Sequence, residues 1–386
     1  MIEQLSDYAM VPGPYLLALG IEIVRTPSGK YYADPSWAKD LLRHLEYIDR
    51  LTLVCPAVDG KADGLDPINH PRLRIVTYRK SSGMIGAVKS LPRLASLIWK
   101  EVGKHRLVHS GVAGWPIPLG FLAVPIGRIR SRKTIVIVES APWRSLPPTL
   151  RSRIHECLAR TLTAAADFVI YTQDEYQRSL PATRAGGGVV SHATWVDEGD
   201  LVIDPATSWA LKGSRPRFLF AGRMVPEKGV RTLLGAISLV SDLDCSFSFI
   251  GSGPDKALIE QCSDPRVQLL DPVRYGPAFF SIVQQHHMLV VPSTSDEQPR
   301  IVYDAFAQAV PVLGSVTAGL SACVENERTG LLVARGNSCE LADAIRSVAK
   351  SPERLEEWGR NAWHVAQSNT HRMMHIRRSH LLVGIR

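Results

Sequence analysis

The sequence predicts an α/β protein built from two doubly wound, Rossmann-like domains. Three observations lead to this class: the length of the chain, its composition, and an alternation of strand-like and helical segments in both halves. The chain has 386 residues, of which 45% are hydrophobic and 21% are charged. Such a length exceeds the usual size of one domain, so two domains are expected. The composition is typical of a folded globular protein and excludes a disordered chain, a coiled coil and a collagen-like repeat.

The first half alternates compact apolar runs with helical segments. The runs lack a polar face, which is typical of parallel strands that are buried on both sides. Helices are predicted between them, for example at 35–48 and 150–166, where apolar residues recur at helical spacing. The predicted strands are 15–24, 51–55, 73–78, 107–109, 134–138 and 168–171.

The second half repeats the scheme, and repeated strand–helix units predict a parallel sheet with helices on both faces. The predicted strands are 217–220, 245–250, 267–269, 288–291, 312–314 and 331–333. The predicted helices are 230–240, 255–261, 278–286, 301–309, 339–349 and 352–369.

A domain boundary is expected within 204–216, because this stretch is rich in small residues, Gly and Pro and precedes a strong strand. We therefore predict a first domain over residues 1–205 and a second domain over residues 206–386. The last helix, at about 370–386, is a candidate for packing back on the first domain.

The chain is basic, with 45 Lys and Arg against 37 Asp and Glu. Residues 1–205 hold 25 of these cations and 20 of these acids, a net charge of +5. The excess favours anionic partners. The positive charge is densest at Arg128, Arg130, Arg132 and Lys133. This cluster is either a solvated turn or a contact for an anionic acceptor or for lipid headgroups.

The N-terminus and the longest apolar stretch argue against secretion and membrane insertion. Glu3 and Asp7 stand where a signal peptide carries positive charge. The stretch 115–126 is too short to span a bilayer and holds three prolines. The six cysteines form no C-x-x-C pair and no zinc-like spacing, which is typical of free thiols in a reducing compartment. We expect a cytoplasmic protein that is at most peripheral at the inner face of a membrane.

The segment 218–237, FLFAGRMVPEKGVRTLLGAI, carries the first chemical signal. A buried strand ends at Gly222, and a short loop leads to a helix that begins near Val230. Ligands of open α/β sheets bind beyond the carboxyl ends of the strands. Arg223 and Lys228 beside a helix N-terminus would suit a diphosphate. The alternative is that both are ordinary surface cations.

The second signal lies in 290–315, where a strand, a polar loop and a helix follow one another. Asp296 falls in the loop and Asp304 about one turn into the helix. Asp304 can accept hydrogen bonds from a diol such as ribose, and the loop amides near Glu297, Gln298 and Pro299 can meet sugar hydroxyls or phosphate. The alternative is that the two aspartates only cap the helix and complement its dipole.

A third, weaker signal is Gly251-x-Gly253 between a strand and a helix, which by itself indicates only a tight turn. In this order and spacing, the three signals and Arg328–Val333 closely resemble the donor domain of retaining glycosyltransferases of family 4, which have the GT-B fold. The resemblance covers about 218–333. It implies two Rossmann-like domains that face a central cleft.

The resemblance also implies roles for single residues. Arg223 and Lys228 would bind the donor diphosphate, Asp304 the ribose, and the loop ending at Val273 the base. Asp296 and the loop after it would meet the transferred sugar. The donor-binding set is then Gly222, Arg223, Lys228, Val273, Glu297, Gln298, Pro299, Arg300, Ile301 and Asp304.

Several positions depart from the pattern of the family. Asp296 and Asp304 stand where two glutamates are usual, and His287 stands where an aspartate is usual. Glu139 follows the strand 134–138, where many members carry a histidine. A carboxylate at the carboxyl end of a strand is a candidate partner for the acceptor hydroxyl; the alternative is a cap on the next element. We expect the catalytic residues to be Arg223, Lys228, Asp296 and Glu139.

The resemblance implies a retaining glycosyltransferase of the hexosyltransferase type. It would use a UDP-, GDP- or ADP-sugar as donor, and a glycan, lipid or small molecule as acceptor. No cofactor and no nucleic-acid partner are expected. No metal is expected either, because no cluster has the ligand set of a dedicated metal site, and cations can serve the leaving diphosphate instead. The alternatives are an epimerase or hydrolase on the same fold and a partner subunit that only binds the donor. A nicotinamide-dependent oxidoreductase is disfavoured because no complete G-x-G-x-x-G follows a strand.

Overall fold

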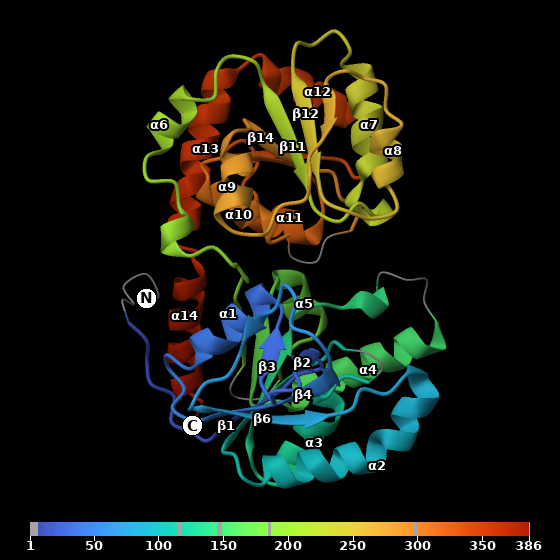
Figure 1. The fold of residues 1–386 in the computed structure, drawn as a ribbon, viewed down its shortest axis with the longest axis vertical. Coiled ribbons are helices and arrows are strands. Elements are labelled where there is room, and N and C mark those ends of the chain that lie inside the picture. Colours follow the sequence, from blue (N-terminus) through green and yellow to red (C-terminus); the bar gives the residue numbers. More distant parts are fainter. Residues whose placement is uncertain (1–6, 115–116, 145–148, 184–186, 296–298, 386) are drawn as a thin grey trace. The chain divides into compact units, whose positions relative to one another are not determined.

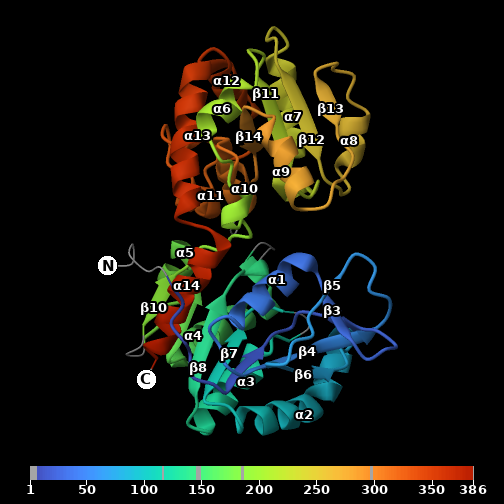
Figure 2. The same ribbon diagram turned by 60° about the vertical axis from the view of Figure 1, so that its left-hand side comes forward.

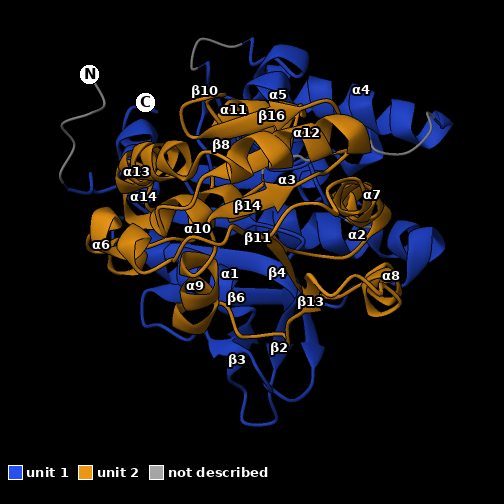
Figure 3. Ribbon diagram, turned by 90° about the horizontal axis from the view of Figure 1, so that it is seen from above, with its two compact units in different colours: residues 1–192, 374–386 blue, residues 193–373 orange. Residues whose placement is uncertain are grey.

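The computed structural model describes residues 7–114, 117–144, 149–183, 187–295 and 299–385. The chain forms two compact units, coloured in Figure 3: residues 1–192 with 374–386, and residues 193–373. Each unit holds one strand-rich sheet with helices around it (Figure 1). The predicted α/β class with two doubly wound sheets is confirmed. The contacts divide the chain after His192, whereas the sequence suggested 205.

Unit 1 is built on a sheet in the order β10-β9-β8-β7-β1-β4-β2-β3-β5, with β6 paired to β4. Helices follow the strands in alternation, as a doubly wound fold requires. The elements of unit 1 are β1 (Tyr15–Ala18), β2 (Ile23–Arg25), β3 (Tyr31–Ala33), α1 (Pro35–His44), β4 (Leu51–Asp59), β5 (Asp66–Pro67), β6 (Leu73–Tyr78), α2 (Gly83–Val102), β7 (Leu107–Gly111), α3 (Gly120–Ile129), β8 (Lys133–Val138), η1 (Pro142–Arg144), α4 (Leu150–Ala165), β9 (Phe168–Tyr171), α5 (Asp174–Ser179), β10 (Gly188–Val190) and α14 (His371–Val383), the last belonging to unit 1 from Met374 on.

The predicted single strand at 15–24 is wrong, because this segment pairs with two separate parts of β4 and is divided into two strands. β1 pairs with the first residues of β4, from Leu51 on, while β2 pairs with its last residues, from Ala57 on. The step between the two pairings breaks the strand after Ala18. β2 then turns back antiparallel into β3, so this edge of the sheet is mixed rather than parallel.

Helix α14 packs on α1 within unit 1, far along the chain from it (Figure 2). His375 Nε2 lies 3.0 Å from Oδ1 of Asp40, and its Nδ1 lies 3.0 Å from the Tyr47 hydroxyl. Arg378 donates to Nε2 of His44 at 3.1 Å. Both His375 and Arg378 are buried, so largely buried polar contacts hold the end of the chain in unit 1.

Unit 2 has a six-stranded sheet in the order β13-β12-β11-β14-β15-β16. Its strands are mostly buried apolar runs, except for the partly exposed edge strand β13, and helices cover both faces. The elements are η2 (Glu198–Asp200), α6 (Pro205–Ala210), β11 (Arg217–Ala221), η3 (Pro226–Lys228), α7 (Val230–Leu239), β12 (Ser246–Ile250), α8 (Lys256–Glu260), β13 (Val267–Leu269), α9 (Pro277–Gln284), β14 (Met288–Val291), α10 (Ile301–Ala307), β15 (Val312–Ser315), α11 (Ala318–Cys323), β16 (Gly330–Val333), α12 (Ser338–Ala349) and α13 (Pro352–Gln367).

Two neighbouring histidines are buried just before β14. His286 donates from Nδ1 to the carbonyl oxygen of Ile282 at 2.7 Å. His287 accepts from the backbone N–H of Arg217 and donates to the carbonyl oxygen of Gly213, both at 3.1 Å. Burial lowers the pKa of each histidine to about 4. His287, which replaces the usual aspartate, therefore acts as a neutral bridge between β11 and the segment before it.

We expect the free energy of unfolding to fall as the pH is lowered from about 6.5 to about 4. In the unfolded chain His286 takes up its proton near pH 6.5, but in the folded protein only near pH 4, so acid favours unfolding. Gln can still donate to Ile282 but does not titrate. In His286→Gln, the loss of stability over this range should shrink by about 1–3 kcal/mol, as measured by urea unfolding.

The matched control is His364→Gln, at an exposed histidine of α13. It should keep the pH dependence of the unmodified protein. An unchanged pH dependence in His286→Gln would contradict the assignment.

Candidate functional site

The sheet of unit 2 reverses its strand order between β11 and β14. β12 and β13 lie on one side of β11, whereas β14, β15 and β16 lie on the other. The described pairs in this sheet are parallel, so the carboxyl ends of the strands share one edge. Open α/β sheets bind ligands outside this edge, at the point of reversal. The candidate site therefore consists of the segments that follow β11, β12 and β14.

These three segments are joined by backbone hydrogen bonds. The N–H of Met224 donates to the carbonyl oxygen of Ser252 at 2.7 Å, and the N–H of Asp255 donates to that of Met224 at 2.9 Å. On the other side, the N–H of Thr294 donates to the carbonyl oxygen of Glu227 at 2.9 Å. The loop between β11 and α7 is thus bonded to both of its neighbours.

Glycines permit the close approach of these loops. Gly251 has a φ of +146°, and a Cβ there would collide with the carbonyl oxygen of Gly222. Gly229 has a φ of +76°, and a Cβ there would collide with the carbonyl oxygen of Pro292. The G-x-G turn, which the sequence left as a weak signal, is therefore a point of backbone contact.

Helix α7 begins inside this arrangement. Its N-cap residue is Gly229, which has no side chain to accept hydrogen bonds from the first N–H groups. Those groups carry partial positive charge and can bind an anion. Gly222 and Arg223 are exposed in the loop before the helix, and Lys228 is half-buried. The loop before the helix N-terminus thus carries two cations, the kind of group that binds a diphosphate.

Asp304 lies in the first turn of α10 and is only 5% exposed. The hydroxyl of Tyr275 donates to its Oδ1 at 2.7 Å. Burial, and next the charge of Asp304, raise the pKa of Tyr275, so the hydroxyl remains a donor. Tyr275 closely follows the exposed Val273 in the loop between β13 and α9. Tyr275 was not predicted from the sequence, where an aromatic residue near Val273 is the only signal for it.

The other predicted donor residues surround the start of α10. Pro299 is buried, Arg300 is exposed, and Ile301 is the first residue of the helix. The guanidinium of Arg300 lies 5.0 Å from the ring of Trp195, a contact that the sequence did not indicate. Ser293, just after β14, is fully buried, and its Oγ has no hydrogen-bond partner among the described residues. Asp296, Glu297 and Gln298 lie outside the described residues.

Glu139 belongs to unit 1 and follows β8 at the carboxyl edge of that sheet. Its side chain is exposed, and its backbone oxygen accepts a hydrogen bond from Thr172 Oγ1 at 3.1 Å. Although burial disfavours the charged form of Arg378, acidic groups near it, Asp40 and Glu139 among them, raise its pKa. Glu139 therefore lies within the electrostatic reach of a buried cation, and its role towards an acceptor stays a prediction.

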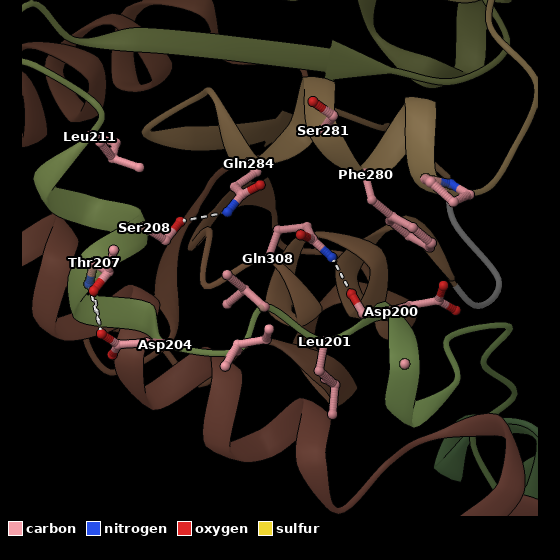
Figure 4. Close-up of a pocket in the computed structure, with 14 residues that line it drawn as sticks. Asp200, Leu201, Asp204, Thr207, Ser208, Leu211, Phe280, Ser281, Gln284 and Gln308 are labelled. Atoms are coloured by element: carbon pink, nitrogen blue, oxygen red, sulfur yellow. Dashed lines mark hydrogen bonds between the residues drawn. The ribbon is translucent and has the colours of Figure 1, made fainter.

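A separate pocket of about 540 Å³ lies between the segment 199–211 and α9 (Figure 4). Gln284 donates to Ser208 Oγ at 3.2 Å, and Gln308 donates to the carbonyl oxygen of Asp200 at 2.6 Å. Asp204 accepts from the first N–H groups of α6. The polar groups that line the pocket thus hold the segment 199–211, including α6, in place. None of the described lining residues is one that we predict to bind the donor.

Known proteins resemble this chain in sequence and in fold. The profile of a family described as glycosyl transferases group 1 matches residues 215–351. Alpha-D-kanosaminyltransferase from Streptomyces kanamyceticus is 24% identical over 312 residues, which cover 72% of this chain and 78% of that protein.

Solved structures match over almost the whole chain. Sucrose-phosphate synthase from Thermosynechococcus elongatus superposes with a TM-score of 0.69 and 18% identity, covering 95% of this chain and 98% of that one. The Anabaena protein HepE, in complex with UDP and glucose, superposes with a TM-score of 0.65 and 17% identity, covering 96% and 98%. The predicted GT-B fold is confirmed.

Gly229→Ala should destabilise unit 2 strongly, because it adds a collision with Pro292 to the strain of a positive φ. The control is Gly213→Ala, where φ is +73° but no atom lies within 4 Å of the added Cβ. We expect about 1 kcal/mol of destabilisation at Gly213 and at least about 2 kcal/mol more at Gly229, from urea unfolding. Equal losses at both positions would show that the close approach of the loops is not needed.

Proposed function

We infer that this chain, which belongs to the glycosyl transferases group 1 family, transfers a sugar from a nucleotide-sugar donor to an acceptor hydroxyl. The reaction retains the anomeric configuration, in keeping with the resemblance to family 4. One observation carries the donor site: Arg223, Lys228 and the N-terminus of α7 share one loop at the point where the sheet of unit 2 reverses. An acceptor glycan, lipid or small molecule completes the reaction.

We propose that the donor diphosphate binds at the N-terminus of α7. The first N–H groups of the helix would donate to phosphate oxygens, because Gly229 offers them no side-chain acceptor. Arg223 can bind two oxygens at once, and Lys228 adds a compact charge. These groups would do the work that a metal ion does at other diphosphate sites, in a family that is typically metal-independent.

The ribose and the base would lie between α10 and the loop that precedes α9. Asp304 can accept hydrogen bonds from both ribose hydroxyls, and its burial would strengthen them. Tyr275 holds this carboxylate through Oδ1. The base would contact the loop at Val273, whose side chain is exposed. HepE has UDP in its structure, so a uridine nucleotide is the first donor to test here.

The transferred sugar would lie next to the residues that follow β14. We propose Asp296, Glu297, Gln298 and Pro299 for its hydroxyls, and Glu139 for the acceptor hydroxyl. The acceptor oxygen would attack the anomeric carbon from the side that the diphosphate leaves, and its proton would pass to the leaving phosphate. Negative charge then builds on the diphosphate, where Arg223, Lys228 and the α7 amides would stabilise it. No protein nucleophile is required.

Arg223→Ala and Lys228→Ala should each lower kcat/KM by about tenfold or more, because each removes a cation from the developing charge. The measurement is sugar transfer, after a thermal-shift screen with UDP, GDP, ADP and their sugars has identified the donor. Arg360→Ala, on the exposed face of α13, is the matched control and should keep full activity.

Turnover of the donor that requires an acceptor supports the proposed reaction. Donor turnover that is equally fast without any acceptor would instead identify a hydrolase or an epimerase. A loss below tenfold in both cation variants would contradict the diphosphate site.

Tyr275→Phe should weaken the binding of the nucleoside diphosphate by about five- to thirtyfold, because Asp304 loses the hydroxyl that orients it. Isothermal titration calorimetry measures this change. Tyr31→Phe, at a half-buried tyrosine of unit 1, is the control and should bind normally. Tighter binding in Tyr275→Phe would mean that the hydroxyl competes with the ribose instead of positioning the carboxylate.

A further inference from the structure

Helix α2 exposes a row of large apolar side chains along its outer face. Ile85 is 76% exposed, Val88 54% and Trp99 45%. Their spacing of three, and then eleven, residues puts them on one side of the helix. Ile98 and Val102 pack inward on the adjoining face, so α2 is fixed in unit 1 while this row remains outside. Isolated exposed apolar residues are common, but a row of them on one helix marks an interaction surface.

A basic row runs beside the apolar row on the same helix. Lys89, Arg93 and Lys100 are exposed and follow one another at intervals of four and seven residues. The helix has one acid, Glu101, which is buried and accepts from Arg74 at 2.6 Å and Lys104 at 2.9 Å. These contacts, that of Arg74 first, lower the pKa of Glu101 to about 2. All exposed charges of α2 are therefore positive.

The end of α3 extends this surface. Ile129 is 70% exposed, and the guanidinium of Arg130 lies 4.8 Å from the ring of Trp99. α3 lies beside α2 in unit 1 (Figure 2). We call the whole set the α2 face: Met84, Ile85, Val88, Lys89, Arg93, Trp99, Lys100, Ile129 and Arg130.

The α2 face also resolves the basic cluster that the sequence indicated at 128–133. Arg128 forms an ion pair with Asp167 at 3.1 Å, and Arg132 donates to the carbonyl oxygen of Gly103 at 2.8 Å. These two cations serve the fold. Arg130 joins the cations of α2 beside Trp99 instead. Arg130, the C-cap residue of α3, thus adds its charge to the exposed cations of α2.

We propose that the α2 face docks on a membrane whose lipids carry anionic headgroups. Apolar and aromatic side chains beside Lys and Arg are what a helix needs to lie in the plane of such an interface. A second copy of this chain is disfavoured, because it would bring the same positive charges together. Within the described part of the chain, no helix has the length and apolar character to cross a membrane, so attachment would be peripheral. The proposal does not depend on the reaction proposed above.

The experiment measures the partition of the full chain onto vesicles. Phosphatidylcholine vesicles are compared with vesicles that also contain phosphatidylglycerol, at low and at raised salt. We expect binding to the anionic vesicles that weakens with salt, and little binding to the neutral ones. Ile85→Ser with Val88→Ser, and Lys89→Glu with Arg93→Glu, should each lower the partition about tenfold or more.

The matched controls change exposed residues of unit 2. Ile203→Ser with Leu211→Ser removes a similar apolar area, and Lys350→Glu with Arg360→Glu makes the same change in net charge. Both should bind anionic vesicles as the unmodified chain does. If the controls lose as much binding as the variants of the α2 face, or if neutral and anionic vesicles bind equally, the proposal is wrong.

Hydrogen exchange on vesicles provides a test without substitution. Residues 83–102 of the unmodified chain should gain protection with anionic vesicles, and unchanged exchange there would overturn the proposal even if the chain bound elsewhere. Binding of the nucleoside diphosphate, followed by thermal shift, should be the same in all four double variants, which separates this surface from the donor site. Lost nucleotide binding in the α2-face variants alone would identify their effect as a failure of folding and not of docking, and would count against the proposal.

Discussion

The contact between the backbones of three loops is the constraint on which the candidate site depends. The loop after β11 is hydrogen-bonded to the loops after β12 and β14, and glycines make room for this approach at Gly229 and Gly251. Because Gly229 is also the N-cap of α7, the same residue that lets the loops meet leaves the start of the helix without a side-chain cap. The packing of the loops and the proposed anion site therefore depend on one backbone arrangement.

The sequence was sufficient where the position of a residue follows from local order. A strand end followed by a helix start predicts the place of Arg223, Lys228 and Asp304, because the edge of a parallel sheet brings such segments together. It was insufficient where distant segments meet. Tyr275 and Asp304 are 29 residues apart, and their hydrogen bond depends on how the loop before α9 is placed. Likewise, the break between β1 and β2 follows from the length of β4, which the run 15–24 does not reveal.

The basic cluster of unit 1 also depends on contacts that the order of the residues does not reveal. The sequence showed four cations close together at 128–133, but adjacency along the chain did not decide which of them face water. Arg128 pairs with Asp167 and Arg132 donates to the carbonyl oxygen of Gly103, whereas Arg130 lies over the ring of Trp99. The buried histidines near β14 differ from these surface cations. His287, which departs from the family pattern, and its neighbour His286 are held as neutral hydrogen-bonding groups in the core.

We propose that the loop between β11 and α7 binds a diphosphate. A crystal structure of the chain with the nucleoside diphosphate that it prefers would show where the phosphates lie. We expect phosphate oxygens at the first N–H groups of α7, with Arg223 and Lys228 in contact with them and the ribose at Asp304. A nucleotide bound elsewhere, for instance in the pocket between the segment 199–211 and α9, would contradict it.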